Sequence, residues 1–285
     1  MTMPTQTRES GFKTNADYKI TFEPSPRRVR VQFNGETVAD SVSARLLFET
    51  RHLPVYYFPR SDVRMDLLQP TEHHTFCPHK GTASYWTLRV GDKSSENAVW
   101  AYPEAFDEVD AIKDFVAFYW DRADHWYEED EEIFVHPRDP YKRVDVIASS
   151  RHVRVILGGE TIADTRRGRF LFETLLPTRY YIPPEDVRTD LLVPSDRVTA
   201  CPYKGQARYY SAQIGGQRFP DIVWSYPEPI PECPKIKGLL CFFHEQVDAI
   251  QVDGVEVPRP VTPWSKDWKD KAATVPDMRG PVVRP

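Results

Sequence analysis

VRVQFNGETVAD at Val29–Asp40 returns as VRVILGGETIAD at Val153–Asp164. In each copy, apolar and polar residues alternate around a two-residue break, Asn34-Gly35 or Gly158-Gly159. Alternation with a period of two is typical of strands that bury one face, and such glycine-containing pairs form the turns of tight β-hairpins. Each copy is therefore predicted to contain a β-hairpin near its start.

The repeat extends over most of the chain, always at an offset of 124 positions and without a gap. The further pairs are LFET at 47–50 and 171–174, YYFP at 56–59 and YYIP at 180–183, DVRMDLLQP at 62–70 and DVRTDLLVP at 186–194, CPHKG at 77–81 and CPYKG at 201–205, and VWAYPE at 99–104 and VWSYPE at 223–228. This period is far longer than the roughly 20 to 50 residues of solenoid repeats, so a whole domain is duplicated. We expect one copy at 15–130, a second at 140–257, and a proline-rich, charged tail at 258–285.

The predicted fold class is mainly β, with two tandem small antiparallel β domains and short helical turns. Aromatic and β-branched residues fill the segments LLFET, VYYF, SYWTLRV and AVWAY, as is typical of strands. SDVRMDLL resembles a single helical turn that is capped by Ser61 or Asp62 and stops at Pro70. Residues 110–120 are expected to form a short turn leading into a strand. Two alternatives stay open for the tail, which is either disordered or anchored through Trp264 and Trp268.

Composition and charge bound the function. The 285 residues include 40% hydrophobic and 28% charged residues, with a net charge of -5, so no basic footprint for nucleic acid is present. No apolar run approaches the roughly 18 to 20 residues of a membrane span, and the first residues lack the apolar core of a signal peptide. We expect a cytoplasmic protein with no nucleic-acid or membrane partner. Its four cysteines form no CxxC pair and are expected to be free thiols.

The repeated pieces GETVAD, LFET, YYFP, DVR, CPHKG and VWAYPE resemble the family catalogued as domain of unknown function 427, in a tandem arrangement. The resemblance covers about residues 18–127 and 142–256. It implies the β-tent architecture, in which a small pair of antiparallel sheets leans together over a cleft. The family is in places labelled a putative nucleotidyltransferase, but the chain has neither a paired-Asp strand nor a Gly-Ser phosphate turn, and we discount that label. Fold alone does not supply function.

The CPxKG element offers the clearest candidate chemistry. Cys77 and Cys201 are candidate nucleophiles, because Lys80 and Lys204 lie three residues on across a tight turn and an ammonium group activates a thiolate. The alternative is that each cysteine is a small buried hydrophobe at a hairpin end.

Glu49 and Glu173 follow apolar strand residues, so each carboxylate must face water, a cleft or a cation. Facing a cleft, they are candidate acid or base groups.

Zinc binding is not favoured by the cysteine and histidine positions. His73, His74, Cys77 and His79 could form a site in the first copy only, since Arg197, Val198, Cys201 and Tyr203 occupy the matching positions. We predict no metal and no cofactor.

Aromatic and arginine residues form the predicted ligand-binding set. Each copy has more tyrosine and tryptophan side chains than a small core can bury, because their hydroxyl and indole N–H groups need hydrogen-bond partners. This surplus favours an aromatic-lined cleft. Arg64 and Arg188 are candidate anion holders, with ion pairs to Asp66 and Asp190 as the alternative. The candidate ligand-binding residues are Tyr56, Arg64, Trp86, Trp100, Tyr102, Tyr180, Arg188, Tyr210, Trp224 and Tyr226.

Three functions stay open on this evidence. The leading one is binding of a small polar or anionic organic ligand in one or both clefts. The second is an enzyme that uses a Cys-Lys pair with a Glu acid or base on a small molecule. The third is a bivalent protein-interaction module. The sequence predicts no oligomeric state.

Overall fold

The computed structural model describes residues 9–15 and 17–265. The chain divides between Arg138 and Asp139 into two compact halves, each with its own sheets. Each half is described by itself below.

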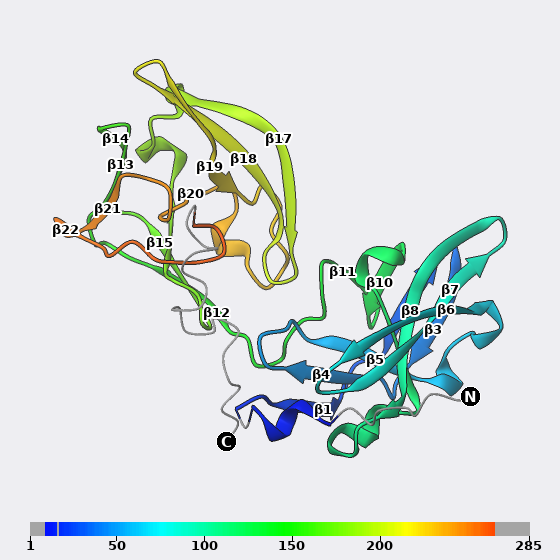
Figure 1. Ribbon diagram of the computed structural model, residues 1–285. Coiled ribbons are helices and arrows are strands. Elements are labelled where there is room, and N and C mark those ends of the chain that lie inside the picture. The colour runs from blue at the N-terminus through cyan, green and yellow to red at the C-terminus, as the bar shows by residue number, and fades with distance from the viewer. Residues whose placement is uncertain (1–8, 16, 266–285) are drawn as a thin grey trace. The chain divides into compact units, whose positions relative to one another are not determined.

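The first half contains a seven-stranded and a four-stranded antiparallel sheet (Figure 1). The larger sheet has the order β1-β4-β5-β9-β8-β7-β6 and the smaller one β11-β10-β2-β3. The strands are β1 (Ile20–Pro24), β2 (Val29–Phe33), β3 (Glu36–Ser41), β4 (Arg45–Glu49), β5 (Val55–Pro59), β6 (Leu68–Cys77), β7 (Gly81–Val90), β8 (Lys93–Ala105), β9 (Phe115–Phe118), β10 (His125–Glu128) and β11 (Glu131–Ile133).

The second half repeats this arrangement, with sheets β12-β15-β16-β20-β19-β18-β17 and β14-β13-β21-β22. Its strands are β12 (Val144–Ala148), β13 (Val153–Leu157), β14 (Glu160–Thr165), β15 (Arg169–Glu173), β16 (Arg179–Ile182), β17 (Leu192–Cys201), β18 (Gly205–Ile214), β19 (Gln217–Ser225), β20 (Leu240–Phe242), β21 (Ala249–Val252) and β22 (Val255–Glu256). The predicted fold class, two tandem antiparallel β domains with short helical turns, is confirmed.

The helical elements among the described residues are all short 3-10 turns. They are η1 (Gly11–Lys13), η2 (Arg60–Asp62), η3 (Met65–Leu67), η4 (Asp107–Ile112), η5 (Trp120–Arg122), η6 (Pro184–Asp186), η7 (Thr189–Leu191) and η8 (Pro234–Ile236). The predicted turn and strand within residues 110–120 correspond to η4 and β9.

The opening hairpins form as their turn residues predict. Asn34 and Gly35 have φ values of 49° and 79°, and Gly158 and Gly159 have φ values of 59° and 76°. Two successive residues with positive φ make the turn whose twist matches that of the flanking strands. The turn residues therefore set the register in which β2 pairs with β3, and β13 with β14.

The predicted helical turn before Pro70 is wrong in its details. η2 and η3 are two separate 3-10 turns, and no side chain caps either of them. Ser61 instead donates a hydrogen bond to Asp62, 2.9 Å. Pro70 does not end a helix but lies inside β6, opposite Trp86. β6 is an edge strand, where a residue without an N–H group is tolerated.

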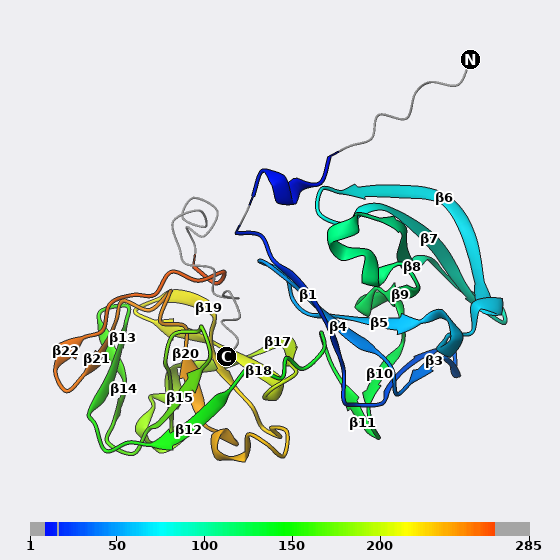
Figure 2. The same cartoon turned by 90° about the horizontal axis from the view of Figure 1, so that it is seen from below.

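The first half has apolar side chains on both faces of its larger sheet. One cluster fills the space between the two sheets, with Val31 from β2, Phe58 from β5 and Val99 from β8. A second cluster lies on the opposite face, where η4 packs (Figure 2). It includes Tyr57 and Tyr102. Because strand residues alternate between faces, the neighbours Tyr56 and Tyr57 belong to different clusters.

Part of the C-terminal tail docks on the second half. Thr262 is fully buried and its hydroxyl donates to Glu245, 2.6 Å. The backbone carbonyl of Trp264 accepts a hydrogen bond from Gln246, 3.2 Å. The docking alternative therefore holds for the tail up to residue 265, and Trp268 lies outside the described residues.

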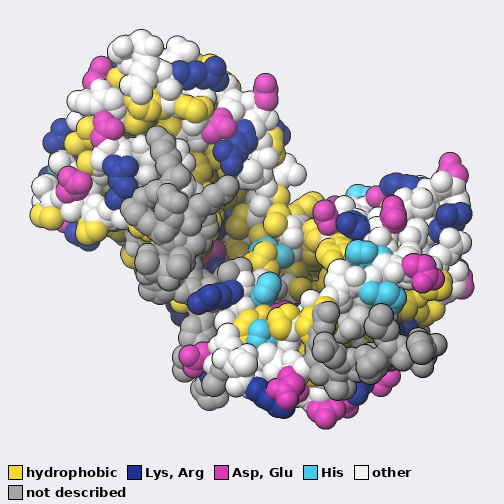
Figure 3. Space-filling model, in the orientation of Figure 1, with side chains coloured by type: hydrophobic (Ala, Val, Ile, Leu, Met, Phe, Trp, Pro, Cys, Tyr) yellow, Lys and Arg dark blue, Asp and Glu magenta, His cyan; other side chains and the backbone are white. Residues whose placement is uncertain are grey.

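Over the described part of the chain, no helix is long and apolar enough to cross a membrane. On the face shown in Figure 3, basic and acidic side chains are interspersed in both halves.

Candidate functional site

A buried lysine–glutamate pair occupies the same place in each half. Lys80 Nζ contacts Glu49 Oε2, and Lys204 Nζ lies 2.5 Å from Glu173 Oε2. Both glutamate side chains are only 6% exposed. A buried carboxylate is costly without a cation, and the lysine supplies one. The sequence predicted that each glutamate faces water, a cleft or a cation, and in the structure each one faces a cation.

The CPxKG element forms the hairpin turn that places the lysine. Cys77 pairs with Gly81 at the end of the β6-β7 ladder, and the Lys80 N–H donates to the Cys77 carbonyl, 3.3 Å. Gly81 has a φ of 99°, and a Cβ there would lie 2.8 Å from the Glu104 carbonyl oxygen. Only glycine fits both conditions. The turn therefore fixes Lys80 beside the end of β4, although Lys80 and Glu49 are 31 residues apart.

The two halves differ in the third group at the pair. In the first half, Tyr18 donates a hydrogen bond to Glu49 Oε1, 2.6 Å. In the second half, Lys142 occupies the matching position, and its Nζ lies 3.9 Å from Glu173 Oε1. One carboxylate therefore meets a lysine and a neutral hydroxyl in the first half, but two lysines in the second.

The segment before the first strand covers the turn in each half. The Tyr18 ring stacks on His79 at 3.5 Å between centroids, and the Gly11 N–H donates to the Pro78 carbonyl, 2.7 Å. Burial lowers the pKa of His79. In the second half, Tyr203 replaces His79 and accepts a hydrogen bond from the Asp139 N–H, 2.8 Å. This cover limits the access of water to both pairs.

A tyrosine of the VWxYPE motif lies near each pair. Lys80 Nζ lies 5.7 Å from the centroid of the Tyr102 ring. Burial raises the pKa of Tyr102, and burial with neighbouring Cys201 raises that of Tyr226 well above its usual value. Both hydroxyls therefore stay protonated at neutral pH and can donate hydrogen bonds.

All four cysteines are free, as predicted. Burial by itself would lower the pKa of Lys204, but the neighbouring Cys201 and Glu173 side chains outweigh burial and raise it. The thiol of Cys201 thus belongs to the electrostatic surroundings of the lysine. The other two thiols are buried, and burial raises the pKa of Cys233 to about 11 and that of Cys241 to about 12.

These environments predict an order of thiol reactivity. Cys77 and Cys201 are half-buried, so in the folded protein at pH 8 we expect iodoacetamide to modify both before Cys233 and Cys241. Peptide mass spectrometry over time would read each site separately, with the urea-unfolded chain as the control. Modification of Cys241 as fast as that of Cys201 would contradict this assignment.

The predicted aromatic residues divide between the two faces of the larger sheet. Trp100 and Tyr102 pack in the cluster that also contacts Cys77, on the face of the Lys80–Glu49 pair. Tyr56 and Trp86 belong to the core between the sheets. The structure therefore does not bring these four side chains into one cleft.

The second half shows the same rings in a single core cluster. Trp224 donates to the Tyr181 hydroxyl, 3.1 Å, and Tyr226 is buried. Tyr180 and Tyr210 are partly buried against the same core. All four rings are therefore engaged in packing.

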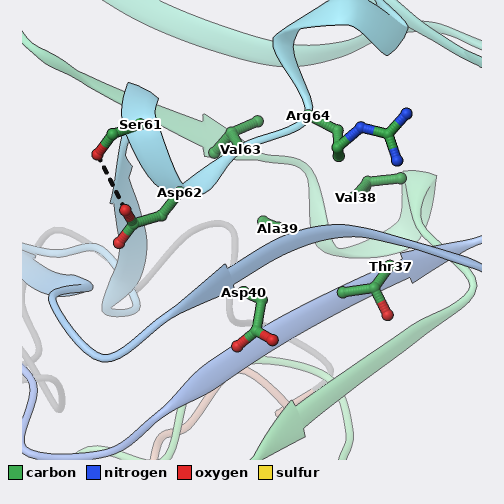
Figure 4. Close-up of a pocket in the computed structure, with 8 residues that line it drawn as sticks. All are labelled: Thr37, Val38, Ala39, Asp40, Ser61, Asp62, Val63 and Arg64. Atoms are coloured by element: carbon green, nitrogen blue, oxygen red, sulfur yellow. Dashed lines mark hydrogen bonds between the residues drawn. The ribbon is translucent and has the colours of Figure 1, made fainter.

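The predicted anion holders lie in exposed turns. Arg64 forms a bidentate ion pair with Asp66, 2.9 and 2.7 Å, and Arg188 does the same with Asp190. Arg64 also lines a pocket of about 350 Å³ formed by β3 and the turn around η2, in which it lies at the opposite end from the Ser61–Asp62 hydrogen bond (Figure 4). No residue of the Lys80–Glu49 pair lines this pocket. The structure therefore shows the alternative role of Arg64 and Arg188, which is an ion pair with a nearby aspartate.

The histidines of the first copy are not gathered around Cys77. His79 stacks on Tyr18, whereas His73 packs on Tyr85 at 4.6 Å between centroids. In the part of the chain that the structure describes, no group of three or more His, Cys, Asp or Glu side chains is arranged to hold a metal ion.

A buried ion pair of another kind was missed from the sequence. Arg179 makes a bidentate contact with Glu245, 2.7 and 2.6 Å, and the Glu245 side chain is fully buried. The Arg179 guanidinium also lies 5.5 Å from the ring centroids of both Trp224 and Trp264. The offset of 124 places Val55 opposite Arg179 and Asp121 opposite Glu245. The sequence did offer one signal for this pair, because the second copy has a charged residue, Arg179, where the first copy has valine.

Tyr18 and Lys142 were missed for a related reason. They lie outside the repeated motifs, in segments where the two copies share few residues. The offset of 124 shows that Lys142 replaces Tyr18, but the sequence does not show that Tyr18 contacts Glu49 or that Lys142 contacts Glu173.

The comparisons with known proteins agree with the duplication. Comparison with curated proteins finds no match to this chain. Two segments, residues 21–129 and 145–253, each match one family, and together they cover most of the chain. The chain therefore belongs, with two tandem copies of the domain, to the family described as Domain of unknown function (DUF427).

Proposed function

We propose that the protein binds a small anionic organic ligand, and that the second half holds it at the cluster Lys142, Lys204 and Glu173. The single observation that carries this proposal is the exchange of Tyr18 for Lys142 at otherwise matched glutamate–lysine pairs. The exchange leaves the second cluster with one positive charge more than its carboxylate balances.

Charge and burial together favour an anion at this cluster. The Lys142 side chain is 17% exposed, and Lys204 is buried, so their charges are only partly screened by water. At an effective dielectric constant of about 20, two unit charges about 4 Å apart interact by roughly 4 kcal/mol. A carboxylate or phosphate group beside Lys142 would compensate the excess charge. The protonated Tyr226 hydroxyl adds a neutral donor nearby.

Titration calorimetry with acetate, succinate, citrate and phenyl phosphate tests this proposal. We expect at least one of these anions to bind with one site per chain, and Lys142→Met to weaken that binding at least about tenfold, which corresponds to about 1.4 kcal/mol. Tyr18→Met is the matched control, because it changes the same position in the other half and should leave the affinity unaltered. The proposal fails if none of the four anions binds, or if Lys142→Met binds as the wild type does.

A second candidate function is an enzyme that uses Cys201, Lys204 and Glu173. It is supported by the turn that joins Cys201 and Lys204, in which the Lys204 N–H donates to the Cys201 carbonyl, 3.3 Å. This function requires the thiol to react covalently, whereas binding does not. Cys201→Ser should therefore retain anion binding, and it should abolish turnover only if the protein is an enzyme.

A further inference from the structure

The pocket beside β3 is built on a backbone framework that the second half repeats. In the first half, Ala39 of β3 pairs with Val63 after η2, and in the second half Ala163 of β14 pairs with Val187 after η6. In each half, the N–H of the next residue donates to the carbonyl of the residue just before the paired alanine, 2.9 and 2.8 Å. The side chains that this framework carries can therefore be compared directly between the halves.

One aspartate on this framework has a cation in the second half. The Arg167 guanidinium donates to both carboxylate oxygens of Asp186, 2.6 and 3.2 Å. The Thr165 hydroxyl donates to the same carboxylate, 2.6 Å. The hydrogen bonds from Arg167 lower the pKa of Asp186. The charge of Asp186 is therefore compensated within the chain.

The matching aspartate of the first half, Asp62, meets hydroxyl groups instead. The Ser41 hydroxyl donates to Asp62, 2.6 Å, and so does the Ser61 hydroxyl, 2.9 Å. Ser43 stands where the second half has Arg167, and the N–H of each donates to the hydroxyl two residues before it, 3.0 and 2.9 Å. The two backbones are thus placed alike, but the serine carries no charge. Among the described residues, Asp62 forms no ion pair that would compensate its carboxylate.

Asp62 lines the pocket of about 350 Å³, at the end away from Arg64 (Figure 4). Asp40, the other carboxylate in the lining, is held bidentately by Arg28, 2.7 and 2.5 Å. The volume lies at the lower end of the range of small-molecule sites. The pocket therefore combines a carboxylate that lacks a cation with room for a ligand that supplies one.

We propose that this pocket binds a small alkyl guanidinium compound, with the guanidinium group at Asp62. The bound group takes the place that the Arg167 side chain has in the second half. An ion pair near the surface contributes little by itself, so the alkyl chain is expected to lie along Val38 and Val63, which also line the pocket. The site is independent of the anion cluster at Lys142, because it lies in the other half of the chain and uses no residue of that cluster.

Nuclear magnetic resonance of the backbone N–H groups tests the site, with butylguanidinium chloride as the probe. We expect the signals of Ala39 and Val63 to shift saturably with butylguanidinium and not with butylurea, which has a similar shape but no charge. Asp62→Asn keeps an acceptor oxygen for the serine hydroxyls and removes the charge, so it should weaken the binding at least about fivefold.

Ser43→Arg is the decisive variant. It gives the first half the arginine that holds Asp186 in the second, so the Ala39 and Val63 signals should no longer respond to butylguanidinium. Val42→Arg is the matched control, because it adds the same charge at the neighbouring position, which is 75% exposed, and should leave the binding nearly unaltered. Both positions lie in an exposed turn, so the strands stay intact. Equal shifts with butylurea, or full affinity in Ser43→Arg or in Asp62→Asn, would overturn the proposal.

Discussion

Arg179→Met is expected to lower the free energy of unfolding of the second half by about 3 to 5 kcal/mol. The Glu245 side chain is fully buried, so loss of the guanidinium leaves a charge with neither a cation nor water around it. The hydroxyl of Thr262 would remain as a donor, but one neutral hydrogen bond does not offset the desolvation of a carboxylate. The loss should also release Trp264, which packs on the same guanidinium.

Urea unfolding followed by hydrogen exchange of peptides from the second half would measure this effect without interference from the first. Arg167→Met is the matched control, because the Arg167 side chain is 62% exposed and its ion pair with Asp186 should contribute little to the unfolding free energy. The double variant Arg179→Met/Glu245→Leu should recover much of the lost stability, since it removes the stranded charge. Equal effects of Arg179→Met and Arg167→Met would show that the buried pair is not what stabilises this region.

Lys80→Met should cost the first half about 3 kcal/mol, and Lys204→Met should cost the second half less. After Lys80→Met, the Tyr18 hydroxyl is the side-chain hydrogen-bond donor that Glu49 keeps among the described residues. After Lys204→Met, Glu173 still has the Lys142 ammonium group at 3.9 Å. The same substitution therefore leaves a stranded charge in one half and a paired one in the other.

The same exchange measurement, read for peptides of each half, would compare the two variants. Glu49→Gln/Lys80→Met serves as the control, because it removes both charges and should be close to the wild type in stability. If Lys204→Met cost as much as Lys80→Met, Lys142 would not act as a second cation for Glu173.

The fold was predictable because its signals are local. Asn34-Gly35 fixes a turn whose geometry depends on two residues, and the repeat supplies the same signal a second time. The end of the helical turn was mispredicted for a physical reason. Pro70 is compatible both with a helix stop and with an edge strand, and only the sheet order reveals that β6 lies at an edge.

The sequence identified residues of the candidate site but not the contacts between them. Glu49 and Lys80 stood out as a costly carboxylate and a turn lysine, but their contact spans 31 residues and depends on how β4 and the β6-β7 turn come together. Arg64 satisfied the chemistry of an anion holder, yet its own neighbour Asp66 was within reach on the same turn. Local pairing of this kind competes with any ligand, and sequence spacing does not show which one prevails.

The proposed anion site is tested most directly by exchanging the third group between the halves. In the variant Tyr18→Lys/Lys142→Tyr, the excess positive charge moves from the Glu173 cluster to the Glu49 cluster, while the composition of the chain stays the same. Hydrogen exchange with and without the anion that binds the wild type would show which half the ligand protects. We predict protection in the second half of the wild type and in the first half of the exchanged variant. Protection that stays in the second half after the exchange would contradict the account.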